Sequence, residues 1–144
     1  MKRIYLDNAS TTPVDKEVVE AMKPYFTQKY GNASSLHSFG REARDAIEKS
    51  REKVSELIGA KSEEIVFTGG GTESDNLATK GIPLREGKGH IITSQIEHPA
   101  VMNTCRHFEK KGFEVTYLPV DEYGIVNTDD VKNAIKDDTI LITI

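Results

Sequence analysis

The chain has 144 residues, which is enough for one domain with a buried core. Apolar residues make up 37% and charged residues 29%, a composition typical of a globular protein with a well-charged surface. A formal charge of −4 argues against nucleic acid as the main partner, because phosphate backbones need a basic face. No apolar run approaches the ~20 residues that a bilayer span needs. Asp7 and Asn8 interrupt the first apolar segment, which excludes a signal peptide.

The chain contains a single cysteine, which excludes an internal disulfide and fits a reducing compartment. We therefore expect a cytoplasmic protein. Cys105 lies on the apolar stripe 101/105/108 of a predicted helix, with no histidine three or four residues away. Such a thiol is usually a small buried hydrophobe and not a nucleophile. The histidines at 37, 90, 98 and 107 lack the paired spacing of metal ligands, so no metal site is predicted.

Residues 1–60 predict a helical N-terminal arm. Residues 4–6 predict a short strand or extended arm, and Asp15 is expected to cap a helix with apolar residues at helical spacing (Val18, Val19, Met22, Phe26). A polar loop, 31–35, precedes a long helix over 37–58 that ends at Gly59. Its apolar face is expected to comprise Ala43, Ile47, Val54, Leu57 and Ile58. Arg41/Asp45 and Arg44/Glu48 are spaced to form charge pairs on the opposite face.

Residues 61–144 alternate between strand and helix patterns. Strands are expected at 64–67, 90–93, 113–118 and 139–144, and helices from Thr72 to about Lys80, from Pro99 to about Lys111, and after Thr128. Pro83 is expected to stop the first of these helices. The alternation predicts an α/β fold with a mainly parallel sheet and helical crossovers. An apolar strand with no following helix leaves an open sheet edge, from which we expect the chain to be part of a longer protein.

The most distinctive stretch is a glycine turn at the end of strand 64–67. Gly69, Gly70 and Gly71 lead into Thr72 and a helical pattern. Glycines allow a sharp turn and a close approach of a ligand to the backbone. The unpaired N–H groups and positive dipole end of the helix, beside the Thr72 hydroxyl, would suit a phosphate monoester. The alternative is a plain capped turn in which Thr72 and Asp75 form a capping box without any ligand.

His98 follows the strand 90–93, in the loop before Pro99. Ligands of parallel α/β sheets gather at the carboxyl ends of the strands. If strands 64–67 and 90–93 are neighbours, His98 comes close to whatever the Thr72 turn holds. Its imidazole could stack on an aromatic cofactor or carry a proton near neutral pH. The alternative is a helix-start residue with a purely local hydrogen bond.

Four segments in order, YLDNASTTP (5–13), GNASSLH (31–37), TGGGTESDNLA (68–78) and EHPAV (97–101), closely resemble cysteine desulfurases of the NifS/IscS type. These are pyridoxal-phosphate (PLP) enzymes of the class V aminotransferase group. The resemblance implies that residues 61–144 are the first part of the large, cofactor-binding α/β domain of a PLP-dependent transferase, preceded by the arm 1–60. It implies that Gly71 and Thr72 hold the cofactor phosphate, and that His98 stacks on the pyridine ring and takes part in proton transfers.

The resemblance also implies an activity and partners. The family removes sulfur from L-cysteine to give L-alanine, and passes the sulfur through a cysteine persulfide to an acceptor or iron–sulfur scaffold protein. A homodimer is expected on the same ground. The alternatives are another class V enzyme, such as a selenocysteine lyase or an aminotransferase, and a non-catalytic remnant that acts as an interaction module.

The sequence departs from the family pattern at several positions. Gly69-Gly70-Gly71 replaces the usual Ser-Gly-Ala, Ala33 stands where proline is general, and Asp75 stands where asparagine is frequent. The chain corresponds to about the first third of such an enzyme. The Schiff-base lysine, the aspartate facing the pyridine nitrogen and the persulfide cysteine lie later in the family, and Cys105 does not match that cysteine. We therefore expect residues 1–144 alone to be inactive.

Overall fold

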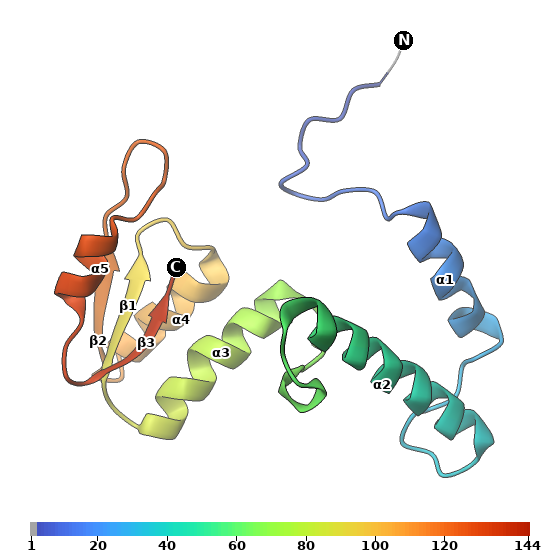
Figure 1. Ribbon diagram of the computed structural model, residues 1–144. Coiled ribbons are helices and arrows are strands. Elements are labelled where there is room, and N and C mark those ends of the chain that lie inside the picture. Colours follow the sequence, from blue (N-terminus) through green and yellow to red (C-terminus); the bar gives the residue numbers. More distant parts are fainter. Residues whose placement is uncertain (1–2) are drawn as a thin grey trace. The chain divides into compact units, whose positions relative to one another are not determined.

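A computed structural model describes residues 3–144, which form two compact units: the residues up to Val66 and residues 67–144 (Figure 1). The first unit contains α1 (Lys16–Thr27), α2 (Ser38–Ile58) and a single 3-10 turn, η1 (Ser62–Glu64). The second unit contains, in chain order, α3 (Gly71–Glu86), β1 (His90–Ser94), α4 (Pro99–Glu109), β2 (Glu114–Leu118), α5 (Thr128–Ala134) and β3 (Thr139–Thr143).

The second unit is built on a three-stranded sheet with the order β2-β1-β3, in which β1 pairs with both neighbours in parallel (Figure 1). The crossovers from β1 to β2 and from β2 to β3 contain α4 and α5. The predicted α/β fold with a parallel sheet and helical crossovers is therefore confirmed. The strands expected at 90–93, 113–118 and 139–144 all form, with ends shifted by one residue.

The hydrophobic core of the second unit lies between β1 and α4. Every residue of β1 is buried, as expected for a central parallel strand. The stripe Val101, Cys105 and Phe108 of α4 faces inward, as predicted, and Phe108 meets Phe113 edge-to-face with ring centres 5.0 Å apart. The apolar face of α4 thus packs against the sheet, and α3 packs against α4 and β3.

A buried histidine joins the three strands near their amino ends. His90 is fully buried in β1, and its two ring nitrogens lie 2.9 Å from Thr139 Oγ1 in β3 and 2.8 Å from Thr116 Oγ1 in β2. Burial lowers the pKa of the imidazole, and the nearby Lys136 ammonium lowers it further. The neutral ring therefore satisfies its hydrogen bonds inside the sheet without bringing a charge into it.

In the first unit, arginine side chains of α2 are hydrogen-bonded to backbone carbonyls of the preceding loop. Arg44 donates through Nε and Nη2 to the Ala33 carbonyl (2.9 and 2.7 Å), and Arg41 donates through Nη1 to the Leu36 carbonyl (2.7 Å). Gly40 is buried where this loop crosses the helix, and a Cβ there would lie 2.2 Å from the Ser35 carbonyl oxygen. The predicted cap of α1 by Asp15 and the left-handed Gly59 at the end of α2 are both confirmed.

Several local predictions are wrong. Of the two alternatives for residues 4–6, a short strand or an extended arm, the strand does not form. The predicted strand 64–67 is replaced by the end of η1 and an extended segment without a strand partner. A strand needs a neighbour to take its hydrogen bonds, and none of the residues in 3–144 supplies one here. The helix from the glycine turn continues through the buried Pro83 to Glu86, because its packing outweighs the loss of one backbone hydrogen bond.

The side-chain predictions for the first unit also need correction. Neither the Arg41/Asp45 nor the Arg44/Glu48 pair is found among the described residues, because both arginines bind loop carbonyls instead. The predicted apolar face of α2 is not a core: Ile47, Leu57 and Ile58 are exposed. Within residues 3–144 no helix combines the length and the apolarity required to cross a membrane.

Candidate functional site

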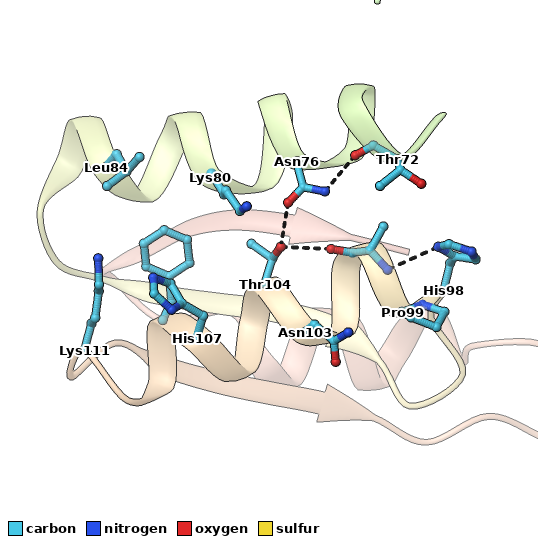
Figure 2. Close-up of a pocket in the computed structure, with 12 residues that line it drawn as sticks. Thr72, Asn76, Lys80, Leu84, His98, Pro99, Asn103, Thr104, His107 and Lys111 are labelled. Carbon is cyan, nitrogen blue, oxygen red and sulfur yellow. Dashed lines mark hydrogen bonds between the residues drawn. The ribbon is translucent and has the colours of Figure 1, made fainter. Parts of the chain in front are cut away.

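A groove of about 610 Å³ lies between α3 and α4 in the second unit (Figure 2). Thr72 and His98, from the first turns of the two helices, lie at one end of it, and Leu84 and Lys111 lie at the other. The structure therefore brings together two residues that the sequence singled out for a ligand site. Gly71 directly precedes Thr72 but is not among the lining residues.

The glycine turn is held in place by polar side chains on both sides. Thr68 Oγ1 lies 2.6 Å from Ser74 Oγ, and the Glu73 carboxylate accepts the Gly69 backbone N–H. The helix N-cap is Gly70, which has no side chain, so the predicted capping box of Thr72 with Asp75 is wrong. The Glu73 carboxylate bonds back to Gly69, before the helix, so no side chain caps the first N–H groups of α3.

The first turn of α3 contains hydrogen-bond donors that have no acceptor among the described residues. The N–H groups of Glu73 and Ser74 donate to the Gly70 carbonyl (3.1 Å each). Within the described chain, neither the N–H groups of Gly71 and Thr72 nor the Thr72 hydroxyl make a hydrogen bond, as expected for the first residues of a helix. The first turn thus offers three donors at the positive end of a 16-residue helix, which suits an anion.

His98 is the N-cap of α4, and its Nδ1 accepts a hydrogen bond from the Ala100 N–H at 3.1 Å. The local hydrogen bond that the sequence offered as the alternative therefore exists. It does not occupy the whole ring, because a neutral imidazole with an accepting Nδ1 carries its proton on Nε2. His98 is exposed at the groove, so its ring face and Nε2–H remain available to a ligand.

The ionisable side chains that line the groove are all basic. Its lining includes Lys80, Lys111 and the two histidines His98 and His107, and no aspartate or glutamate. The remaining polar positions are neutral, among them Asn76 and Thr104. An anionic ligand is therefore favoured along the groove. At the start of α3 the Glu73 carboxylate bonds the Gly69 N–H and opposes the helix dipole.

Sequence reasoning missed Asn76 and Thr104, which are hydrogen-bonded to each other further along the groove than Thr72 and His98 (Figure 2). A signal was present, since each residue lies four positions after a first-turn residue and so shares its helix face. Cys105 lies elsewhere: it is buried in the core and lines no part of the groove. Burial raises the pKa of its thiol, in agreement with the inert role predicted for it.

The fold and the groove define a parallel α/β domain in which a glycine-bounded helix start and a histidine lie at one end of a groove with basic lining residues. The chain belongs to the aminotransferase class-V family, whose model matches residues 4–144. It is 60% identical to the cysteine desulfurase IscS of Dictyoglomus turgidum and 57% identical to that of Methanosarcina thermophila. These matches cover 100% and 99% of this chain but 37% and 36% of the two relatives, so the chain spans little more than a third of their length.

Solved structures agree with the sequence comparisons. A NifS-like protein superimposes with a TM-score of 0.92 at 41% identity, over 98% of this chain and 39% of its own. SspA in complex with cysteine superimposes with a TM-score of 0.88 at 44% identity, over 93% of this chain and 39% of its own. The resemblance to cysteine desulfurases noted in the sequence is therefore confirmed at the level of both sequence and fold.

Proposed function

We propose that this chain forms the phosphate-binding and ring-binding side of the active site in a PLP-dependent cysteine desulfurase. Such an enzyme converts L-cysteine to L-alanine and transfers the sulfur through a cysteine persulfide toward iron–sulfur cluster assembly. The names of the most similar relatives support this reaction class, and a bound cysteine in a structural relative supports the substrate.

One observation carries the proposal: Thr72 and His98 line the same groove, and the amides of Gly71 and Thr72 have no partner among the described residues. PLP combines a phosphate with a flat aromatic ring. A helix start with three free donors fits the phosphate, and the imidazole of His98, which lines the same groove, fits the ring. The absence of carboxylates from the groove lining fits the negative charge of the phosphate.

In this proposal each residue has a defined task. Gly71 and Thr72 donate backbone N–H bonds to the phosphate, the Thr72 hydroxyl adds a third, and the α3 dipole stabilises the charge. His98 stacks on the ring and uses Nε2 to hold or move a proton of the substrate, while the Ala100 N–H bond at Nδ1 fixes the ring orientation. Bound PLP supplies the electron sink for the chemistry at the amino acid carbon.

The family-level partners are also proposals. We propose L-cysteine as the substrate, a sulfur-acceptor or iron–sulfur scaffold protein as the recipient, a homodimer as the assembly and the cytoplasm as the location. No lysine or cysteine of this sequence matches the Schiff-base lysine or the persulfide cysteine of the resemblance. Turnover is therefore assigned to the longer enzyme, and the contribution of this chain is to bind and orient the cofactor.

The phosphate assignment is tested with Thr72→Val. Loss of a hydrogen bond to a charged phosphate should weaken PLP binding roughly tenfold to a hundredfold. The dissociation constant is measured by fluorescence titration of the full chain with PLP. Thr128→Val is the matched control, because Thr128 is also exposed at the start of a helix but lies outside the groove. Equal PLP affinity in the Thr72 variant and the wild type would refute the assignment.

The ring assignment is tested with His98→Ala against His107→Ala. Both histidines line the groove, but only His98 lies beside the glycine turn (Figure 2). We expect the His98 variant to change the absorption and circular dichroism of bound PLP, because the stacking partner is lost, and the His107 variant to leave both unchanged. The reverse order of effects would move the ring to the far end of the groove.

A further inference from the structure

We infer that Asn76 and Thr104 are positioning residues that fix the distance between the Thr72 turn and the His98 turn. The inference rests on the proposed function, since it deepens the role of the same groove. Within the described chain, the contact between these two side chains is the single side-chain hydrogen bond that joins α3 to α4. It lies further along the groove than Thr72 and His98, toward the middle of the groove (Figure 2).

The first half of the link is on α3. The Asn76 Nδ2 group donates to the Thr72 carbonyl oxygen at 2.7 Å, one helical turn earlier. Because only Nδ2 can donate, this bond fixes the orientation of the amide and directs Oδ1 toward α4. Asn76 therefore presents an acceptor whose position depends directly on the turn that carries Thr72.

The second half is on α4. Thr104 is buried, and its hydroxyl lies 3.1 Å from Asn76 Oδ1 and 2.8 Å from the Ala100 carbonyl oxygen. A hydroxyl has one proton, so the two acceptors share it. Ala100 in turn donates its N–H to His98 Nδ1. The link thus runs from Thr72 through Asn76, Thr104 and Ala100 to His98.

A purely local role is the competing explanation, because asparagine and threonine side chains often bond to a carbonyl four residues earlier within one helix. Thr79 provides the matched control. It is buried in α3 and donates to the Asp75 carbonyl at 2.6 Å, but makes no bond to α4. Thr79→Val therefore removes a local bond of the same kind as the Thr104–Ala100 bond and leaves the inter-helix link intact.

The test uses the full chain and two measurements. The first is the PLP dissociation constant of Thr104→Val, Asn76→Ala, the double variant, Thr104→Ser and Thr79→Val. We expect each of the first two to weaken binding about fivefold and the double variant to be no weaker, because all three lose one shared bond. Thr104→Ser, which keeps the hydroxyl, should restore wild-type affinity, and Thr79→Val should retain it.

The second measurement is the nitrogen NMR shift of the His98 ring without PLP. We expect it to move in Thr104→Val and not in Thr79→Val. Failure of the wild type to take up PLP would defeat the proposed function, and the His98 signal would then decide the positioning role alone. Equal effects of Thr104→Val and Thr79→Val, or additive effects of the two link variants, would overturn the inference.

Discussion

The two units of the chain differ in what holds them together. Residues 67–144 bury a core in which Phe108 is 1% exposed, whereas Phe26 in α1 is 71% exposed. Every buried hydrophobic residue of the described chain belongs to the second unit. The helices of the first unit have the same apolar periodicity in sequence as α4, yet most of their apolar side chains are exposed. Helix formation and core formation are therefore separate outcomes, and only the second requires a partner surface.

The first unit is instead organised by polar and backbone contacts. Its loop is bound to α2 by Arg41, Arg44 and the close approach at Gly40. Contacts of this kind define a conformation but bury little apolar surface, so they contribute little of the stability that a core gives. The chain spans little more than a third of its relatives' length, and within residues 3–144 the apolar faces of α1 and α2 are largely exposed.

The largest expected difference between the units is at the two phenylalanines. Phe108→Ala should destabilise the second unit by about 3–5 kcal/mol, because it leaves a cavity beside Phe113. Phe26→Ala should change stability by about 0.5 kcal/mol or less. Hydrogen exchange of β1 and of α1, measured separately, gives the two values. A large loss in α1 protection on Phe26→Ala would show that the first unit has a core of its own.

Opposite signs are expected for one substitution in two helices. Gly40→Ala should destabilise the first unit by about 1–3 kcal/mol, because the new Cβ would meet backbone oxygens of the loop. Gly81→Ala in α3 has open space around its Cβ and should stabilise that helix by about 0.5–1 kcal/mol. Thermal unfolding of both variants tests this. Stabilisation by Gly40→Ala would mean that the loop does not lie on α2.

The buried His90 makes the second unit sensitive to pH. Its pKa is lowered in the folded state, so below about pH 6.5 the unfolded state binds more protons and stability falls as the pH falls. The loss is at most about 1.4 kcal/mol for each pH unit between the two pKa values. Urea unfolding between pH 7.5 and 5 measures the slope, which should be smaller in His90→Gln. An equal slope in the variant would assign the effect to another group.

The smallest effect is expected at an exposed ion pair beside this histidine. Lys136 donates to Glu114, and this hydrogen bond lowers the pKa of the Glu114 carboxyl. Lys136→Met should raise that pKa toward its ordinary value of 4.5, which NMR titration measures. The stability of the second unit at neutral pH should not change detectably, since exposed pairs contribute little. A clear loss of stability would show that this pair helps to hold the segment before β3 against the start of β2.

Much of the second unit could be predicted because its signals are local. The apolar runs at 90–93 and 139–144, the stripe 101/105/108 and the glycine turn specify strands, an inward helix face and a helix start from residue order alone. The predicted strand 64–67 failed for the opposite reason. An apolar run becomes a strand only beside a partner strand, and residue order does not show which partner is available.

The residues of the candidate site also differ in whether the sequence alone could identify them. Gly71, Thr72 and His98 could be named from sequence because a glycine turn and a histidine after a strand are local features with a clear chemical meaning. The link through Asn76 and Thr104 could not be named, since its two ends lie 28 residues apart and meet only where α3 packs on α4.

The sequence by itself determined the periodicities, the helix starts and ends, and the family to which the chain belongs. Each of these is indicated by short segments of neighbouring residues. Tertiary structure alone decided which apolar faces are buried, that the helix continues through Pro83, and that the Thr72 and His98 turns share one groove. Those outcomes depend on contacts between distant segments, whose free energy is set by the surfaces that meet and not by the order of neighbouring residues.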